Sequence, residues 1–317
     1  MQHKTGHVAS ASIDKSGTLP PPGTRIGLIA GSGQLPLVFA QALFDRSTAN
    51  HGKSREDYPL FVAAHEGEAD PAIEQIATAV KWVKLGQFKK IIHFMLQNRV
   101  EWIVMAGGIT KTNVWKIRPD SMALSIAISL KSLHDDQLLR AVAKKLEQHG
   151  FTLGSITDFV PDLLTPPGAL TKKGPDQNQW KDIRFGWHAA KELGRLDIGQ
   201  GVVVKKGVVV SVEAMEGTDA MLKRTGALIS GSAKSWTQKD SAILIKTAKP
   251  QQDHRLDLPT IGPETIENVH KAGIRVVAIE ANATMILEPE TTVRLADKYN
   301  IILLGCTEQA IQKVEID

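Results

Sequence analysis

The densest group of chemically able side chains lies in residues 249–263, KPQQDHRLDLPTIGP. Lys249, Asp253, Arg255 and Asp257 stand here within nine positions, between prolines that exclude a regular helix. A carboxylate can bind a divalent ion or orient water, and cations can meet the charge of phosphates, which is what cleavage of a pyrophosphate needs. From the residues alone, a salt-bridged surface loop remains an equal alternative.

A second acidic group lies in residues 212–222, VEAMEGTDAML. Glu213, Glu216 and Asp219 bracket a Gly-Thr turn, and three carboxylates can hold Mg²⁺ or the hydroxyl groups of a ribose. Thr218 and the neighbouring backbone N–H groups can meet an anion. The alternative is that Thr218 caps a helix and that the carboxylates belong to the surface.

Three other polar residues have simpler explanations. Asp135 and Asp136 open a predicted helix, where carboxylates cap the backbone, and a metal site would need further oxygen donors. His254 has charged neighbours in the sequence, but adjacent side chains diverge, so we expect it to be solvated.

Two glycine turns follow predicted strands, GSGQLP at 31–36 and AGGIT at 106–110. Glycines let the backbone approach a phosphate, and open α/β sheets bind ligands at the carboxyl ends of their strands. We therefore expect both turns to line one crevice, although plain connections remain the alternative. The dinucleotide fingerprint is incomplete, because Pro36 stands in place of the third glycine, and this disfavours a nicotinamide enzyme.

The elements that must position these residues alternate between strand and helix, which predicts an α/β fold with a parallel sheet in the first half. The second half is also α/β, with a hairpin at 202–213 and a less regular order. Predicted strands are 25–30, 60–64, 80–86, 102–108, 242–248, 274–280, 284–288 and 301–305, and predicted helices are 37–44, 72–80, 86–99, 121–133, 136–150, 180–196, 263–273 and 289–299.

Length and composition set the broad class. A chain of 317 residues exceeds the ~250 at which single cores divide, so we expect two domains, with a boundary in the proline- and glycine-rich stretch 161–180. The polar segment 1–23 is predicted to be a disordered leader.

A net charge of +4 and scattered lysines argue against duplex nucleic acid as a partner. No apolar run reaches the ~18 residues that a membrane span needs.

The single cysteine, Cys306, excludes an intramolecular disulfide and a cysteine zinc site. It stands in the apolar run IILLGC, so we expect a buried thiol and a reducing, cytoplasmic location.

Five segments together resemble the UDP-2,3-diacylglucosamine pyrophosphatase family of lipid A biosynthesis, of the LpxI type. They are IGLIAGSGQLP, DDQLLRAV, GRLDIGQG, VEAMEGTDAMLKR and KPQQDHRLDLPTIG, and the similarity runs from about Arg25 to Gly305. The resemblance implies a Rossmann-like N-terminal domain at 24–160, a C-terminal α/β catalytic domain at 161–317, and substrate held between them. The implied reaction is Mg²⁺-dependent hydrolysis of UDP-2,3-diacylglucosamine to UMP and 2,3-diacylglucosamine 1-phosphate.

The resemblance also implies roles for individual residues. Asp257, in the R-x-D-L-P-T segment, is expected to be catalytic together with Arg255, and Asp257 and Asp253 are the expected metal ligands. Gly108 departs from the family pattern, which puts the contribution of that loop in doubt. The expected substrate-binding residues are Gly31, Gly33, Lys111, Asp136, Gln200, Glu213, Glu216, Thr218, Asp219 and Lys249.

The expected partners are the UDP-linked lipid and, transiently, the inner-membrane surface, while the oligomeric state stays open and includes a homodimer. The competing hypothesis is a module that binds a nucleotide sugar or a phospholipid without chemistry, since glycine turns need no catalytic group. A nicotinamide-dependent oxidoreductase is the third reading.

Overall fold

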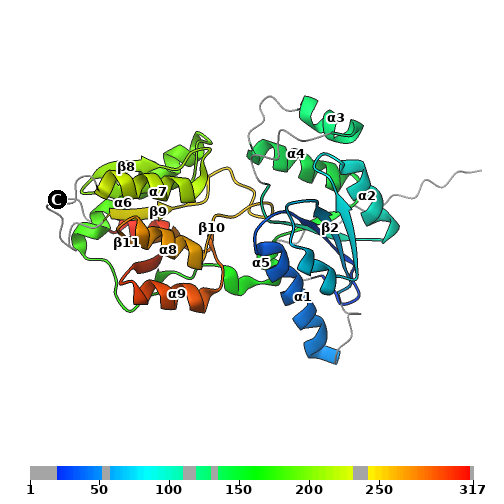
Figure 1. The fold of residues 1–317 in the computed structure, drawn as a ribbon, viewed down its shortest axis with the longest axis horizontal. Coiled ribbons are helices and arrows are strands. Elements are labelled where there is room, and N and C mark those ends of the chain that lie inside the picture. Colours follow the sequence, from blue (N-terminus) through cyan, green and yellow to red (C-terminus); the bar gives the residue numbers. More distant parts are fainter. Residues whose placement is uncertain (1–19, 52–57, 110–118, 130–134, 231–241, 315–317) are drawn as a thin grey trace, which may run out of the picture.

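The computed structural model describes residues 20–51, 58–109, 119–129, 135–230 and 242–314 (Figure 1). These residues form two lobes that lie side by side, each built on its own sheet. The predicted leader lies outside the described residues except for its last four positions.

The first lobe contains five parallel strands in the order β3-β2-β1-β4-β5. The strands are short apolar runs, as expected where a parallel sheet is covered on both faces. Their bounds are β1 Ile26–Ala30, β2 Leu60–His65, β3 Ala79–Val83, β4 Trp102–Ala106 and β5 Thr152–Gly154. The predicted α/β fold with a parallel sheet is confirmed.

Helices cover both faces of this sheet. One face packs against α1 (Leu35–His51) and α5 (Ile156–Phe159), in a core that includes Phe39 and Phe159. The other face packs against α2 (Phe88–Gln97), α3 (Ser121–Ser129) and α4 (Asp135–Gln148). A 3₁₀ turn, η3 (Pro161–Leu163), follows α5 and leads toward the second lobe.

The helix predicted at 72–80 is wrong. The chain forms only a 3₁₀ turn, η1 (Pro71–Gln75), which Asp70 caps by accepting from the Ala72 N–H at 2.9 Å. From Ala79 the backbone joins the sheet as β3, because the neighbouring strand β2 offers its backbone hydrogen bonds there. Sheet pairing therefore overrides a weak helical pattern.

The second lobe contains a six-stranded mixed sheet in the order β6-β13-β11-β9-β7-β8. Strands β9, β11 and β13 are parallel, and β7 pairs antiparallel with both β8 and β9. The bounds are β6 Gly168–Ala169, β7 Gly201–Lys205, β8 Val208–Val212, β9 Ala242–Lys246, β11 Ile274–Glu280 and β13 Ile302–Cys306. A separate two-stranded sheet joins β10 (Thr260–Ile261) to β12 (Met285–Ile286).

The predicted hairpin at 202–213 is confirmed as β7 and β8. Its two turn residues, Lys206 and Gly207, both have positive φ, as a tight hairpin turn requires. The carboxyl ends of β8 and β9 and the start of β7 therefore meet at one edge of the sheet, while the turn lies at the opposite edge.

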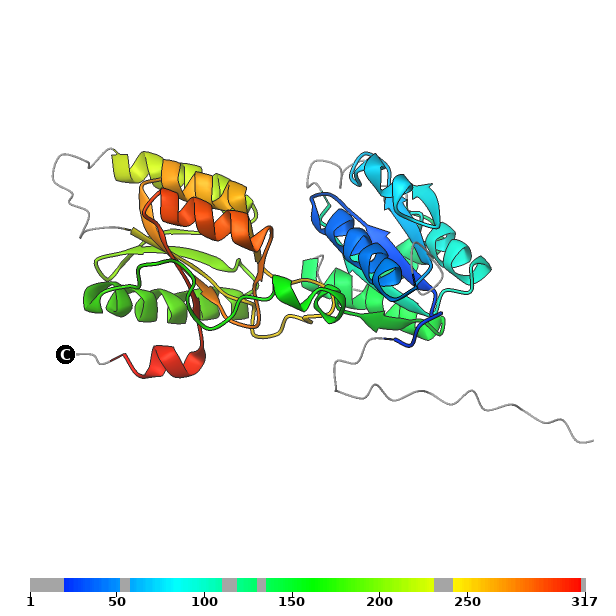
Figure 2. The same cartoon turned by 90° about the horizontal axis from the view of Figure 1, so that it is seen from below.

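Helices also cover both faces of the second sheet (Figure 2). On one side lie α7 (Gly217–Ser230), α8 (Pro263–Lys271) and α9 (Pro289–Lys298), side by side. On the other lie α6 (Gln177–Arg195) and α10 (Glu308–Gln312). Within the described residues, no helix combines the length and the apolar character that crossing a membrane would require.

Cys306 ends strand β13 in the core under α6 and α10. Its side chain is fully buried, and the loss of solvation raises the pKa of the thiol to about 12. The prediction of a buried thiol is confirmed, and this cysteine packs as a small apolar residue.

Candidate functional site

The loop that joins β9 to β10 leaves the second lobe and crosses the edge of the first sheet. Two of its leucines are buried there, Leu256 at 9% and Leu258 at 5% exposure. Leu256 packs in the core under α2 and α4, and Leu258 packs in the core under α1. Asp257 stands between them with an exposed side chain, so the loop holds this carboxylate at the rim of the sheet.

The rim in question is the carboxyl end of β1 and β4, where the two glycine turns begin. The Gly31 N–H donates to the Ala106 carbonyl at 2.9 Å, and Ser32 and Gly108 exchange two backbone hydrogen bonds of 2.7 and 3.1 Å. A Cβ on Gly31 would come within 2.2 Å of the Gly108 oxygen. The prediction that the two turns lie together is confirmed.

Both turns and the Asp257 segment line one cavity of about 210 Å³. Gln34 and Leu35 at the start of α1 also border it, and the N-terminus of a helix is a place where an anion is stabilised. The lining residues share a position at the carboxyl edge of the first sheet or in the segments that cross it: Ser32, Gly33, Gln34, Leu35, Met105, Ala106, Gly107, Gly108, Ile156, His254, Arg255, Leu256, Asp257, Leu258, Met285 and Leu287.

The side chain of Gln252, which the sequence reasoning missed, orients Asp257. Its Nε2 donates to Asp257 Oδ2 at 3.0 Å, and its Oε1 accepts from the Lys249 N–H at 3.1 Å. An amide with both ends bonded cannot rotate freely, so it holds the carboxylate in one orientation. The only signal in the sequence was a polar residue five positions before Asp257.

Asp253 and Arg255 form a pair within the same loop. The guanidinium donates to Asp253 from Nε at 3.1 Å and from Nη2 at 2.8 Å, and Nη1 donates to Glu147 of α4 at 3.1 Å. The hydrogen bonds from Arg255 lower the pKa of the Asp253 carboxyl. In turn, the carboxylates of Asp253 and Glu147 raise the pKa of Arg255. Both oxygens of Asp253 are therefore engaged by the arginine, and the pair ties the loop to the first lobe.

A buried polar cluster lies at the carboxyl edge of the second sheet. Glu213, 7% exposed, accepts from Thr218 Oγ1 at 3.0 Å, and Thr218 accepts from the Lys246 ammonium at 2.9 Å. A Cβ on Gly199 or Gly201 would overlap Glu213, at 2.0 Å from its carbonyl oxygen and at 2.5 Å from Oε2. The GQG segment is thus a glycine cradle for this glutamate.

The other predicted binding residues are spread over several places. Lys249 is paired with Asp197, whose backbone has a positive φ. Gln200 accepts the Thr247 N–H at 3.0 Å through its carbonyl, and its side-chain Oε1 is buried with no hydrogen-bond partner in the described part of the chain.

Two acidic residues of the 212–222 segment point to surface partners instead of joining Glu213. Glu216 pairs with exposed Arg224, and Asp219 accepts from Asn268 at 3.0 Å. Lys111 lies outside the described residues, and Asp136 lies in α4 with a side chain outside them. His254 is exposed, and its carbonyl accepts from Ser155.

Among the described residues, no group of three or more histidine, cysteine, aspartate or glutamate side chains is placed to hold a metal ion. Asp253 is neutralised by Arg255, so Asp257 is the carboxylate at the cavity that can donate oxygen to a cation. Mg²⁺ commonly takes one or two carboxylates and completes its shell with substrate phosphates and water. The residues present therefore fit a metal that shares its ligands with a phosphate substrate.

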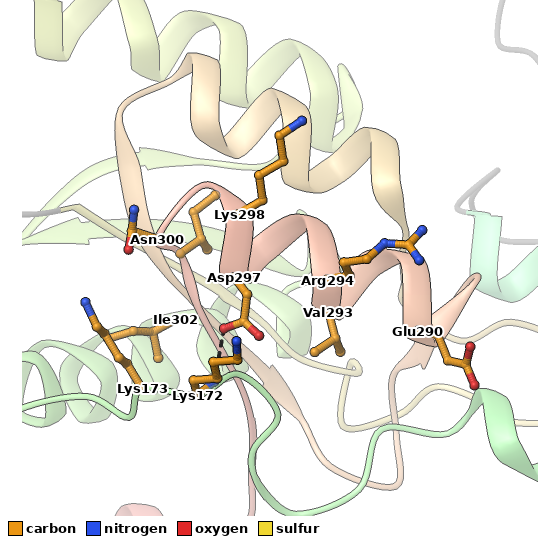
Figure 3. Close-up of a pocket in the computed structure, with 10 residues that line it drawn as sticks. Lys172, Lys173, Glu290, Val293, Arg294, Asp297, Lys298, Asn300 and Ile302 are labelled. Atoms are coloured by element: carbon orange, nitrogen blue, oxygen red, sulfur yellow. Dashed lines mark hydrogen bonds between the residues drawn. The ribbon is translucent and has the colours of Figure 1, made fainter.

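A larger cavity, about 690 Å³, lies on the outer side of α9 in the second lobe (Figure 3). Lys172, Lys173, Arg294 and Lys298 surround it, and Asp297 accepts the Lys172 N–H at 3.1 Å. We call these four residues the basic groove. The groove contains no residue predicted to be catalytic, so its size does not make it the reaction site.

Comparison with known proteins gives two family models. The LpxI N-terminal domain matches residues 25–163, and the LpxI C-terminal domain matches residues 166–304. A curated relative, UDP-2,3-diacylglucosamine pyrophosphatase LpxI of Caulobacter vibrioides, is 32% identical over 90% of this chain and 98% of its own length. A solved structure, N5-carboxyaminoimidazole synthetase of Staphylococcus aureus complexed with ADP, has 12% identity and a TM-score of 0.27 over 83% of this chain and 67% of its own, too low to carry an argument.

The paired glycine turns give the first testable prediction. We expect Gly31→Ala to lower the melting temperature more than Gly33→Ala, because the first methyl overlaps a carbonyl oxygen whereas the second meets open space and carries only the cost of positive φ. That cost is about 1–2 kcal/mol. Thermal unfolding of both variants checks the order, and an equal loss would show that the two turns are not in contact.

Proposed function

This chain belongs to the LpxI family, and from that membership we propose that it hydrolyses UDP-2,3-diacylglucosamine to UMP and 2,3-diacylglucosamine 1-phosphate. The observation that supports the proposal is the placement of Asp257 over the two glycine turns, in a cavity that both lobes line. The curated relative is named for pyrophosphatase activity on UDP-2,3-diacylglucosamine.

The reaction exchanges one P–O bond for another. The oxygen of water bonds to one phosphorus of the diphosphate, the bond from that phosphorus to the bridging oxygen breaks, and the bridging oxygen leaves on the other phosphate. The two protons of water pass to the carboxylate, the products or the solvent. Such a transition state needs a positioned water, stabilisation of negative charge and an in-line geometry.

The described residues can supply these needs. Gly33, Gln34 and Leu35 line the cavity where α1 begins, and the N-terminus of a helix favours a phosphate oxygen. The carboxylate of Asp257 can accept a proton from water or bind the cation that a diphosphate carries. Gln252 keeps this carboxylate in place through its hydrogen bond to Oδ2.

Arg255 and Lys249 receive a different role from the one expected. Each is already paired, Arg255 with Asp253 and Glu147 and Lys249 with Asp197. We propose that they fix the shape of the loop that carries Asp257 and do not meet the leaving phosphate directly. A cation that left its carboxylate to do so would first have to break a hydrogen-bonded pair.

We propose that Mg²⁺ is the cofactor and that it arrives with the substrate. Asp257 would hold it, and the diphosphate and water would complete its coordination. The ion would supply neutralisation of the phosphate charge. A single protein carboxylate binds Mg²⁺ weakly by itself, which agrees with the lack of a larger carboxylate cluster among the described residues.

We also propose that the chain works in the cytoplasm and meets an anionic membrane surface, where a diacylated substrate would be embedded. The cavity of about 210 Å³ is smaller than the pockets that enclose drug-sized ligands, so it suits the diphosphate and not the acyl chains. The cavity at the basic groove is lined by four basic side chains and two acidic ones, Glu290 and Asp297, so its balance is positive and suits anionic headgroups, which attract each lysine or arginine by ~1 kcal/mol.

The alternative is a module that binds the nucleotide sugar without cleaving it. It shares the glycine turns with the hydrolase but gives no reason for a carboxylate held at the rim by two buried leucines and an amide. Release of UMP by the purified protein decides between the two.

We predict that Asp257→Asn lowers the rate of UMP release by a factor on the order of 10²–10⁴, because the amide neither accepts a proton nor binds a cation well. The shape of the side chain is kept, so the melting temperature should stay close to that of the parent. Asp45→Asn, an exposed aspartate on α1 that bonds Gln41, serves as the control and should keep full activity. Normal turnover by the Asp257 variant would overturn its assignment.

We predict that chelation of divalent ions by EDTA stops UMP release and that added Mg²⁺ restores it. The concentration of Mg²⁺ that gives half the maximal rate should be the same in Asp253→Asn as in the parent, because Arg255 already occupies both oxygens of Asp253. A several-fold increase would instead make Asp253 a metal ligand, and activity that survives EDTA would remove the metal from the mechanism.

We predict that the double variant Lys172→Glu with Lys173→Glu sediments less with vesicles that contain phosphatidylglycerol and keeps its activity on substrate dispersed in detergent. The reason is loss of attraction between the basic groove and anionic headgroups. Lys223→Glu, an exposed lysine on α7, changes charge elsewhere and should sediment as the parent does. Equal sedimentation of all three proteins would exclude the basic groove as the contact surface.

A further inference from the structure

Lys246 is a buried lysine that neither the motifs nor the predicted site includes. It ends strand β9 with 5% exposure. A lysine at this depth is rare unless its charge is compensated. Its ammonium donates two hydrogen bonds, to Thr218 Oγ1 at 2.9 Å and to the backbone carbonyl of Thr260 at 3.1 Å.

The first bond leads to a negative charge. Thr218 uses its own proton to bond Glu213 Oε1 at 3.0 Å, so one hydroxyl lies between the ammonium and the carboxylate. Glu213 itself is buried and lies against Gly199 and Gly201, where a Cβ would overlap it. The lysine on the second sheet therefore has a buried counter-charge, with one hydroxyl between the two charges.

The second bond leads to the candidate site. Thr260 lies three positions after Asp257, and its hydroxyl donates to the Leu258 carbonyl at 3.0 Å. Thr260 also begins β10 and pairs with Met285, which packs in the same core as Leu258. The carbonyl that Lys246 binds is thus the point where the Asp257 loop rejoins the second lobe.

We propose that Lys246 is a positioning residue for the reaction, acting through the segment 257–260. Its ammonium links the Glu213–Thr218 cluster to the Thr260 carbonyl and so sets where Asp257 stands over the glycine turns. This inference rests on the proposed function for its kinetic consequence, but the structural link stands without it. It also gives Glu213 and Thr218 a structural role in place of the substrate-binding role expected from the sequence.

The test compares Lys246→Met with Lys246→Arg and with Lys205→Met. Lys205 is an equally buried lysine at the far end of β7, on the opposite edge of the same sheet, so it controls for loss of a buried ammonium. Two readouts are taken: amide hydrogen exchange in residues 253–261, which needs no substrate, and separate values of kcat and KM for UMP release.

We expect Lys246→Met to speed exchange in residues 253–261 while β11 stays protected, and to lower kcat by a factor on the order of 10–100 with KM unchanged, since a displacement of about 1 Å has such effects. Lys246→Arg should recover part of kcat, and Lys205→Met should change neither readout. Unchanged exchange in 253–261, or a raised KM with kcat intact, would overturn the proposal, the latter because it indicates direct contact with substrate.

If Lys246→Met does not fold, Thr218→Val and Thr218→Ser carry the same test. The valine removes the hydroxyl between Glu213 and Lys246, and the serine keeps it, so only the valine should speed loop exchange and lower kcat. Equal behaviour of these two variants also overturns the proposal. If the protein has no pyrophosphatase activity, hydrogen exchange in residues 253–261 still tests the role of Lys246. A failure of this inference can therefore be told apart from a failure of the proposed function.

Discussion

The burial of Leu256 and Leu258 on opposite faces of the first sheet is the contact on which the site depends. These leucines belong to the second lobe by sequence but complete the two cores of the first. The turn in which the Leu256 and Asp257 N–H groups both donate to the Asp253 carbonyl lets the two leucines reach different faces, and it leaves the exposed residue between them at the rim. That residue is Asp257, and the rim is where the paired glycine turns leave a cavity.

Polar contacts then hold the loop that the two leucines anchor, together with the carboxylate of Asp257 that it carries. Gln252 bonds the carboxylate of Asp257, Arg255 ties the loop to α4 through Glu147, and Lys246 holds the point at which the loop returns. All three donors lie within a dozen residues of Asp257. The partners of Gln252 belong to the same loop, whereas Arg255 reaches Glu147 of the first lobe and Lys246 reaches Thr218 of the second. A short segment is rigid here because both sheets hold it.

Local patterns of the sequence predicted much of this arrangement. Short apolar runs marked the strands, the KKG turn marked the hairpin, and prolines marked 249–263 as irregular. The helix at 72–80 was wrong because pairing with β2 decided the conformation of Ala79. The role of Lys246 could not be predicted from the sequence, because a lysine at the end of an apolar strand is expected at the surface. Its burial depends on two partners distant in the sequence, the Thr218 hydroxyl and the Thr260 carbonyl.

The same limit explains the acidic residues of 212–222. Their spacing allows convergence on one cation, but the start of α7 sends Glu216 toward Arg224 and Asp219 toward Asn268, and only Glu213 turns inward. The direction in which a side chain points at the start of a helix depends on which residue begins the helix. Sequence patterns locate that residue poorly.

The family models divide this chain between residues 163 and 166, but its hydrophobic cores do not divide there, since Leu256, Leu258 and Met285 fill the first lobe from the far side of that boundary. A first half made alone would lack part of its own interior, and a second half made alone would carry those apolar side chains uncovered. Recombination between the two halves would therefore remove packing from the first lobe and the Asp257 segment from its cavity in the same step.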